Sequence, residues 1–220
     1  LRALEKDGII IHCTDRPLPI GCVHGAIDWD RRFEHMQQHS GEHIFSGLVY
    51  RHFGFHNVGF HMGRDAITMD FDGVFTMEDA LAIEREVNGA IWHNVPVTVF
   101  YPDAKARETL DYRAKKAIEG KLRLVRIEGY DLCACCGTHV SGSAQIGMVK
   151  FLSAKNFHEG TRLELLCGKR AVRYLSDVYA KAKEAAVMLS TSEDNLAEFT
   201  GKILQENQRL KTKISSLQEQ

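Results

Sequence analysis

The chain has 220 residues, 44% of them hydrophobic, and its 28 Lys and Arg side chains against 29 Asp and Glu give a net charge of −1. This length and composition predict one globular domain of ordinary size plus an appendage. A net charge near zero excludes binding of nucleic acid through an overall basic field, so such binding requires a local basic face. No apolar run approaches 18 residues and no secretory leader pattern opens the chain, which predicts a cytoplasmic protein without a membrane partner.

The first predicted elements lie before residue 53. Residues 1–30 read as short strands and turns, because an apolar run at 9–11 is followed by Pro17, Pro19 and Gly21. We expect this segment to be the end of an N-terminal β-barrel-like region. Apolar residues at helical spacing predict a helix over 29–52. Gly41 and Gly47 interrupt it at a cost of about 1 kcal/mol each relative to alanine, so we expect another segment to pack closely against it there.

Strands and one further helix follow. Thr76 is a plausible cap for a helix that ends at Trp92. Strands separated without strict alternation with helices predict an α+β fold with an antiparallel sheet and packed helices. The expected strands are 66–72, 95–101, 122–127, 145–152 and 161–166.

The chain after Gly168 is predicted to be helical to its end, with a break around 190–192. Thr191 and Asp194 resemble a capping box at the start of the last segment. Leucine or isoleucine recurs every seven residues there, which is typical of a coiled-coil seam with the polar Asn207 in its middle. A long amphipathic helix docked on a further domain explains the pattern equally well. The seam residues are Leu189, Leu196, Ile203, Leu210 and Leu217.

Two short clusters carry candidate metal ligands. His39 and His43 are four residues apart, so on a helix they lie on one face with Cβ atoms about 5–6 Å apart. Cys135 and His139 flank a glycine-containing turn and can chelate one ion. Three imidazoles and one thiolate suit zinc. By spacing alone, His35/His39 is an alternative histidine pair, and Cys133 or Cys136 an alternative thiol.

The same clusters carry a resemblance to a known family. Residues 38–44, Gln-His-Ser-Gly-Glu-His-Ile, resemble the HxxxH motif of the editing domains of alanyl- and threonyl-tRNA synthetases. Residues 129–131 and 135–140, the latter Cys-Cys-Gly-Thr-His-Val, resemble the CxGTHV signature of that superfamily, and 145–147 resemble the segment that follows. Residues 58–63 and 67–72 resemble the strands between the two motifs. The resemblance covers about 31–175.

The resemblance implies a zinc site formed by His39, His43, Cys135 and His139. It also implies hydrolysis of mischarged aminoacyl-tRNA, Ser-tRNA(Ala) or Gly-tRNA(Ala), by a freestanding protein of the AlaX type. The expected domains are the end of a barrel (1–30), a zinc-binding editing domain like the synthetase second additional domain (31–178), and a long helix or coiled-coil linker (179–220) to a DHHA1-type domain. The chain starts at Leu1 rather than Met, so we expect a fragment. Cys136 departs from the family pattern, which has a small residue there.

We also predict roles in the reaction for the zinc ion and for three further residues. Zinc either activates water or anchors the amino group of the substrate. Glu42 is a candidate base, Thr138 a candidate substrate contact, and His61 a candidate for the family's polar residue between the motifs. We also expect a homodimer through the C-terminal helix.

A local basic surplus over 103–126 is the candidate tRNA contact, with a solvated helix face as the plain alternative. Its cations are Lys105, Arg107, Arg113, Lys115, Lys116, Lys121, Arg123 and Arg126.

Two other functions fit parts of the sequence. His39 to His43 also satisfies the HxxEH metallopeptidase pattern with Glu42 as base, which requires a further carboxylate ligand such as Glu84 or Glu86. The second alternative function is that of a non-catalytic module. In this case zinc stabilises the fold and the last helix mediates assembly.

Overall fold

A computed structural model describes residues 2–114 and 120–218 of the chain. It divides into two compact units, Leu1–Arg32 and Phe33–Gln220. Lys115, Lys116 and Glu119 of the expected basic segment lie outside the described residues. Among the helices described, none is both long and apolar enough to cross a membrane.

The first unit holds a β-hairpin. Strands β1 (Arg2–Lys6) and β2 (Ile9–Cys13) pair antiparallel with Lys6 opposite Ile9. Asp7 and Gly8 form the two-residue turn, both with positive φ, at 52° and 74°. Positive φ at both turn positions matches the right-handed twist of the strands, and Asp-Gly tolerates it well. The apolar residues of β2 and the thiols of Cys13 and Cys22 are exposed.

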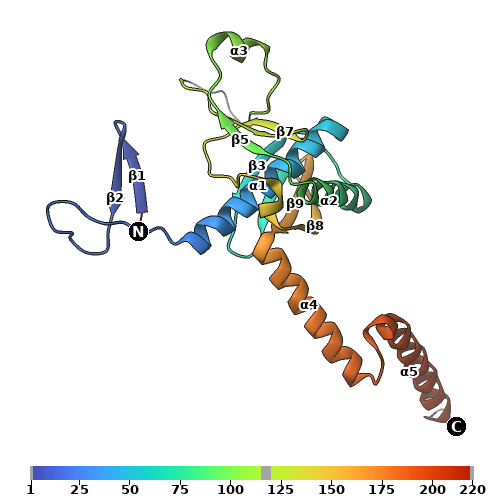
Figure 1. Ribbon diagram of the computed structural model, residues 1–220. Coiled ribbons are helices and arrows are strands. Elements are labelled where there is room, and N and C mark those ends of the chain that lie inside the picture. The colour runs from blue at the N-terminus through green and yellow to red at the C-terminus, as the bar shows by residue number, and fades with distance from the viewer. Residues whose placement is uncertain (1, 115–119, 219–220) are drawn as a thin grey trace. The chain divides into compact units, whose positions relative to one another are not determined.

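The second unit is an α+β fold with two antiparallel sheets, as predicted (Figure 1). One sheet has the order β3-β4-β9-β8 and the other β5-β6-β7. The strands are β3 (Asn57–Met62), β4 (Ile67–Phe71), β5 (Val97–Phe100), β6 (Leu124–Ile127), β7 (Asp131–Ala134), β8 (Val149–Phe157) and β9 (Gly160–Cys167). The helices before β8 are α1 (Trp29–Phe53), α2 (Met77–Trp92) and α3 (Ala104–Thr109).

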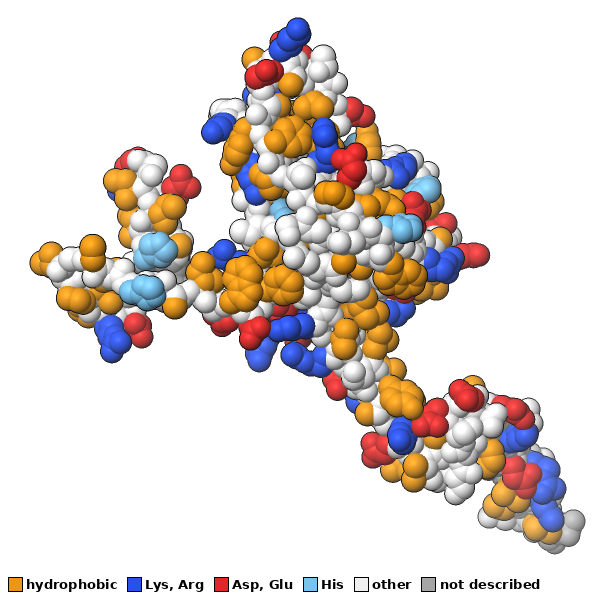
Figure 2. Space-filling view, viewed as in Figure 1, with side chains coloured by type: hydrophobic (Ala, Val, Ile, Leu, Met, Phe, Trp, Pro, Cys, Tyr) orange, Lys and Arg blue, Asp and Glu red, His pale blue; other side chains and the backbone are white. Residues whose placement is uncertain are grey.

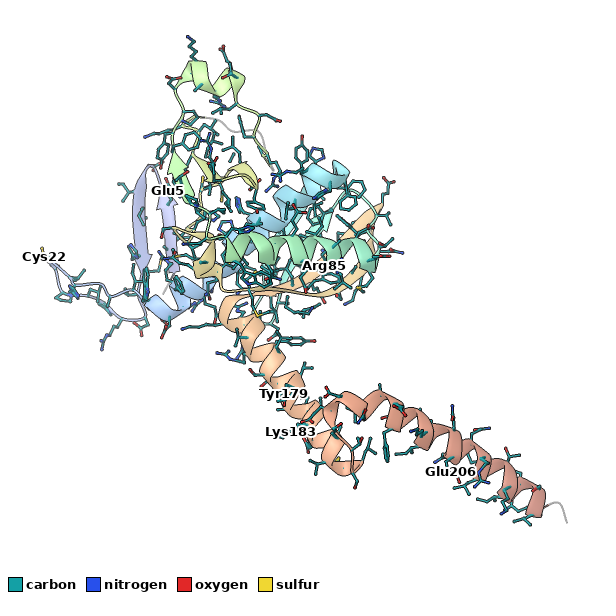
Figure 3. All side chains as sticks on the ribbon, turned by 45° about the vertical axis from the view of Figure 1, so that its right-hand side comes forward. Glu5, Cys22, Arg85, Tyr179, Lys183 and Glu206 are labelled. Atoms are coloured by element: carbon teal, nitrogen blue, oxygen red, sulfur yellow. The ribbon has the colours of Figure 1, made fainter. Side chains whose placement is uncertain are left out.

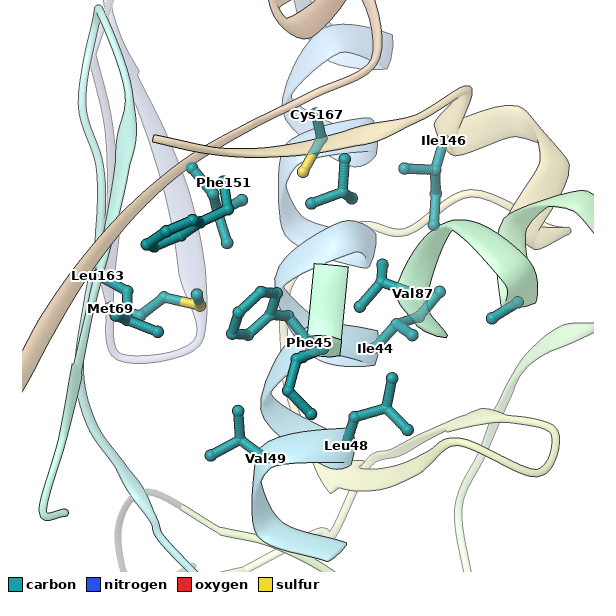
Figure 4. Close-up of a cluster of buried hydrophobic side chains, with 14 of the residues drawn as sticks. Ile44, Phe45, Leu48, Val49, Met69, Val87, Ile146, Phe151, Leu163 and Cys167 are labelled. Carbon is teal, nitrogen blue, oxygen red and sulfur yellow. The ribbon is translucent and has the colours of Figure 1, made fainter. Parts of the chain in front are cut away.

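Helix α1 supplies one wall of the hydrophobic core. Ile44, Phe45, Leu48 and Val49 are fully buried. In Figure 4 these side chains lie among residues from the four-stranded sheet, helix α2 and the turn before β8. Burying side chains of this size contributes about 1.5–3 kcal/mol each, so the core fixes the face that α1 turns inward. The partners labelled in the figure are Met69, Val87, Ile146, Phe151, Leu163 and Cys167.

The two glycines of α1 allow close approach, as expected. A Cβ on Gly41 would collide with the Cys167 side chain, and one on Gly47 would collide with the carbonyl oxygen of Tyr130. Gln38 is fully buried, and its side-chain amide forms two hydrogen bonds with the backbone of Cys167, here called the clamp between Gln38 and Cys167. Its Nε2 donates to the carbonyl of Cys167 at 2.5 Å, and its Oε1 accepts the backbone N–H of Cys167 at 2.9 Å. These contacts fix α1 against the end of β9 and against the start of β7.

One local prediction is wrong, two elements were not predicted, and one predicted helix cap is confirmed. Residues 145–148 are not strand: Ser143–Ile146 form a 3₁₀ turn, whose Ser143 hydroxyl binds the carbonyl of Ala90, and β8 begins at Val149. Strand β7 and the short helix α3 went unpredicted. The Thr76 cap is confirmed, as a full capping box with Asp79.

The C-terminal region is helical with the expected break. Helix α4 (Gly168–Met188) ends before a 3₁₀ turn (Glu193–Asn195), and α5 (Leu196–Gln218) follows. The N-cap of that turn is Ser192, without a side-chain bond, rather than Thr191. Leu189 lies before the break, so the heptad seam within one helix begins only at Leu196.

Both helices present much of their surface to solvent. Exposed apolar side chains of α4 and α5 show as orange between charged residues in Figure 2. Tyr179 and Lys183 of α4 and Glu206 of α5 are labelled in Figure 3, and all three side chains are exposed. The coiled coil, the homodimer and the domain boundaries at 30 and 178 stay predictions.

Candidate metal centre

Four side chains predicted as ligands converge in the second unit. His39 and His43 come from α1, while Cys135 and His139 come from the loop after β7. One donor atom of each lies within 4.8 Å of the others. The ring centres of His39 and His43 are each less than 5 Å from that of His139, at 4.2 and 4.5 Å. The group is therefore compact enough for one metal ion.

Local structure explains the convergence. A spacing of four residues puts His39 and His43 on one face of α1, and β7 ends one residue before Cys135. The loop then turns at Gly137, where a Cβ would collide with the ring of His39. A glycine is thus required for the loop to approach the helix this closely.

Each histidine uses Nδ1 for a protein contact and directs Nε2 to the group. Nδ1 of His43 lies 2.9 Å from Asp131 Oδ2, and Nδ1 of His39 lies 3.3 Å from the carbonyl oxygen of Thr138. Nδ1 of His139 lies 3.1 Å from the hydroxyl of Ser40. A carboxylate or carbonyl only accepts, so Nδ1 of His39 and His43 carries the proton, and in the neutral ring Nε2 keeps its lone pair. Metal-binding histidines are commonly held in this way.

One donor atom has no partner among the described residues. Nε2 of His139 is buried and makes no hydrogen bond there. A buried polar atom left unpaired costs about 1–3 kcal/mol. An ion at the centre of the group would satisfy it, so the residues fit a metal.

Charge in the group also suits a cation. Burial raises the pKa of Cys135, but the nearby rings of His139, His39 and His43 outweigh it and lower the pKa to about 3. The sulfur is therefore a thiolate, the form that binds metal. Burial lowers the pKa of His139 to about 4, so this ring is neutral near pH 7. Burial would also lower the pKa of His43, but the bond to Asp131 outweighs it and raises the pKa to about 9, so the metal-free ring is protonated near pH 7. Binding of a metal to Nε2 of His43 would therefore displace one proton.

The alternative ligands are less well placed. His35 is not in either described group of donor atoms, and Cys136 is exposed. Cys133 belongs to a second compact group with His43 and Asp131. Burial raises the pKa of the Cys133 thiol to about 12, which keeps it protonated.

The other candidate residues lie around the group rather than in it. Glu42 is buried, and its Oε1 accepts bonds from Ser46 and Asn57 at 2.8 and 2.7 Å; its Oε2 lies 3.9 Å from His43 Nε2. Thr138 is exposed and its carbonyl binds His39. His61 is an exposed residue of β3, next to Phe60, and neighbouring strand residues face opposite sides. Since Phe60 stacks on His39 at 5.6 Å, His61 points away from the group.

The carboxylates that the peptidase alternative requires are engaged elsewhere. Glu84 binds the ammonium of Lys150 at 2.8 Å, and Glu86 lies 2.7 Å from His52. Neither belongs to a described group of metal donors.

A cavity of about 330 Å³ opens beside the four donors. His39, His43 and Cys135 form part of its wall, with Phe60 and Cys136. Two cations of the expected basic segment, Lys121 and Arg123, also line it, and no carboxylate does among the described lining residues. A cavity with this wall attracts an anionic ligand.

Arg113 belongs to the same basic segment but, unlike Lys121 and Arg123, does not line this cavity. Its guanidinium is nearly buried and donates to both oxygens of Asp131, at 2.8 and 3.0 Å. The prediction of a tRNA contact at Arg113 is therefore wrong: the side chain is committed inside the protein. Sequence reasoning also missed Asp131, although its place in the Gly-Tyr-Asp segment before the cysteines was a usable signal.

Comparison with known proteins gives the class. Residues 122–163 match the family described as the threonyl and alanyl tRNA synthetase second additional domain. The match includes Cys135 and His139 and ends within β9. Residues 122–163 are therefore similar to this class of domain.

Relatives that align with almost the whole chain point to a narrower group of proteins. The chain is 33% identical over 226 residues to the alanyl-tRNA editing protein Aarsd1 of Danio rerio, covering 100% of the chain and 55% of the relative. It is 33% identical over 214 residues to Aarsd1-B of Xenopus laevis, covering 92% and 51%. It is 29% identical over 223 residues to the alanine–tRNA ligase of Ignicoccus hospitalis, covering 96% and 25%. The chain is similar over almost its whole length to proteins named alanyl-tRNA editing proteins, and it spans about half the length of these curated relatives.

Proposed function

We propose that this chain is the zinc-dependent catalytic part of a freestanding deacylase that hydrolyses mischarged tRNA(Ala). The single observation that carries the proposal is the convergence of His39, His43, Cys135 and His139, with the unpaired buried Nε2 of His139, beside a cavity. The relatives named as alanyl-tRNA editing proteins support the substrate class.

His39, His43, Cys135 and His139 would hold the ion. Zinc bound there supplies a Lewis-acid centre for a carbonyl, an amino group or a water. Asp131 and Thr138 hold the first two rings in the orientation that this requires. Zinc with four protein ligands has the closed geometry of structural sites. Binding of either a substrate group or a water would therefore require one protein ligand to give way. Of the two roles, we favour orienting the substrate.

The cavity wall supports one placement of the 3′ end of the tRNA. Lys121 and Arg123 provide the positive charge that a backbone phosphate requires. Arg123 also donates to the carbonyl oxygen of Cys135, which fixes its guanidinium beside the thiolate. Phe60, stacked on His39, forms an apolar face next to the donors. The aminoacyl ester would therefore lie between a cationic rim and the metal ligands.

Deacylation assays test this proposal. The longest natural form of the protein is incubated with Ser-tRNA(Ala), Gly-tRNA(Ala) and Ala-tRNA(Ala), and amino acid release is followed with and without zinc. We expect release of serine or glycine but not alanine, and loss of both zinc and activity in Cys135→Ala. Cys22→Ala, which removes an exposed thiol of the first unit, is the matched control and keeps full activity.

A negative result is also informative. A folded, zinc-loaded protein that hydrolyses none of the three substrates would overturn the deacylase and leave zinc as a structural ion. Metal analysis of Cys136→Ala separates the two neighbouring thiols, and we expect it to retain one zinc per chain.

A further inference from the structure

An ion pair lies directly behind the metal ligand His43. Asp131, at the first residue of β7, accepts the proton of His43 Nδ1 at 2.9 Å. Arg113 donates to both oxygens of the same carboxylate. The carboxylate is 1% exposed and the Arg113 side chain 10% exposed, so this is a buried, bidentate pair. Burial opposes ionisation of Asp131, but the bonds to His43 and the charge of Arg113 keep its pKa below the usual value.

The backbone holds Arg113 in this place independently of its side chain. Its N–H donates to the carbonyl of Leu132 at 2.8 Å, and its carbonyl accepts the N–H of Ala134 at 2.9 Å. The residue thus lies beside β7 like a short parallel strand. Exchanging the side chain removes the guanidinium without releasing this segment.

Asp131 has a competing use. With His43 and Cys133 it forms the second compact group of possible metal donors. A carboxylate that turned toward an ion would leave His43 without its partner. The planar guanidinium occupies both oxygens in fixed directions, which a flexible ammonium does not do.

We propose that Arg113 is a positioning residue of the metal centre, which fixes Asp131 as the acceptor for His43 and so directs Nε2 of His43 to the ion. The proposal rests on the metal centre proposed above. It assigns Arg113 to the metal site and removes it from the surface that contacts RNA.

Zinc affinity is the measurement that tests this role. The purified chain is stripped of metal and titrated with zinc against a chromogenic chelator of known affinity. Loss of an outer partner of a metal ligand typically weakens binding about 10–100-fold, and we expect this for Arg113→Met. Arg113→Lys retains the charge but not the planar guanidinium that bonds both oxygens of Asp131, so we expect a smaller loss of zinc affinity.

The protein offers a matched control. Arg162 makes the same bidentate pair with Asp70, at 2.6 and 2.8 Å, and Asp70 contacts no metal donor among the described interactions. Arg162→Met should leave zinc affinity unchanged. Cobalt substitution adds a spectroscopic readout: visible absorption reports ligand geometry, so Arg113→Met shifts the bands and Arg162→Met does not.

Folding is controlled separately, because Arg113→Met leaves a buried carboxylate without its partner. Thermal unfolding of the metal-free form identifies a variant that fails to fold. The double variant Arg113→Met/Asp131→Leu removes both charges, and we expect it to fold and to bind zinc as weakly as Arg113→Met. If the wild type binds zinc and both folded variants bind it within twofold of the wild type, this inference is overturned and the metal centre stands. A wild type that binds no zinc overturns the metal centre itself.

Discussion

The hydroxyl of Ser40 lies 3.1 Å from Nδ1 of His139, 99 residues further along the chain, and also accepts the backbone N–H of Val140 at 3.2 Å. Ser40 is fully buried between the two histidines of α1. One hydroxyl therefore joins the helix that carries two of the candidate metal ligands to the loop that carries the other two.

Ser40→Ala is predicted to weaken zinc binding about tenfold, at the lower end of the effect for an outer partner. The His139 ring loses its hydrogen bond and the loop loses one contact to α1. Competition titration with a chelator measures the effect. Ser153→Ala removes a hydroxyl bonded to Glu164 away from the centre and should leave affinity unchanged. Equal affinities for Ser40→Ala and wild type would contradict the role of Ser40.

Glycines in two helices give opposite predictions for stability. Gly47→Ala forces a Cβ onto the backbone oxygen of Tyr130, which cannot move easily, so we expect a loss of about 1–3 kcal/mol. Gly89 in α2 has no atom within 4 Å of an added Cβ, so Gly89→Ala should gain about 0.5–1 kcal/mol. Urea unfolding of the metal-free protein measures both. Two losses of similar size would show that α2 is packed differently from the structure.

The sequence predicted the second unit well because its signals are local and strong. Periodicity located α1 and α2, Thr76 marked the start of α2, and the glycines of α1 marked a close contact. Histidine and cysteine spacing predicted the four side chains that converge, because four residues on a helix define one face. The hairpin of the first unit was also readable, since Asp7-Gly8 is a strong turn signal that we did not use.

Other features depend on contacts between distant residues. Asp131 belongs to the site only because β7 pairs beside β6 and places it 2.9 Å from His43. Arg113 looked like a surface cation because sequence position does not show burial. Residues 145–148 were predicted as the start of a strand, but Ser143 turns the chain by bonding to the carbonyl of Ala90 in α2.

The clamp between Gln38 and Cys167 predicts a second stability effect. Gln38→Leu keeps the volume close to the original but leaves a buried N–H and a buried carbonyl of Cys167 unpaired. Each costs about 1–3 kcal/mol. Gln208→Leu, at an exposed position of α5, is the control and should change stability by less than about 0.5 kcal/mol. Urea unfolding measures the free energy of unfolding of both variants. Equal values for Gln38→Leu and Gln208→Leu would show that the two hydrogen bonds of Gln38 do not stabilise the fold.

Thiol alkylation across pH tests the charge state of the cluster. The nearby histidine rings hold the pKa of Cys135 near 3 against the effect of burial, so its thiolate persists as pH falls from 8 to 5. Burial raises the pKa of Cys133 to about 12, so that thiol stays protonated over the whole range. In metal-free protein we expect labelling of Cys135 to change little with pH, Cys133 to resist labelling, and added zinc to protect Cys135. Mass spectrometry of the alkylated peptides measures all three. A labelling rate for Cys135 that drops tenfold per pH unit below 8 would contradict the thiolate.

Lys121 tests how the cavity engages RNA. Its ammonium lies 4.3 Å from the centre of the Tyr101 ring and lines the cavity beside the metal ligands. Arg123 is less suitable for this test, because it also donates to the carbonyl of Cys135 and its removal would disturb the loop.

If Lys121 binds one phosphate of the tRNA 3′ end, Lys121→Ala should weaken binding of the tRNA. It should also reduce the slope of log affinity against log salt by about 0.7, the value for one contact to a single strand. Binding of deacylated tRNA(Ala) is measured by fluorescence anisotropy between about 50 and 200 mM salt. Lys183→Ala, on the exposed face of α4, is the charge-matched control and keeps the slope of the wild type. Equal slopes for Lys121→Ala and wild type would place the phosphate contacts outside this cavity.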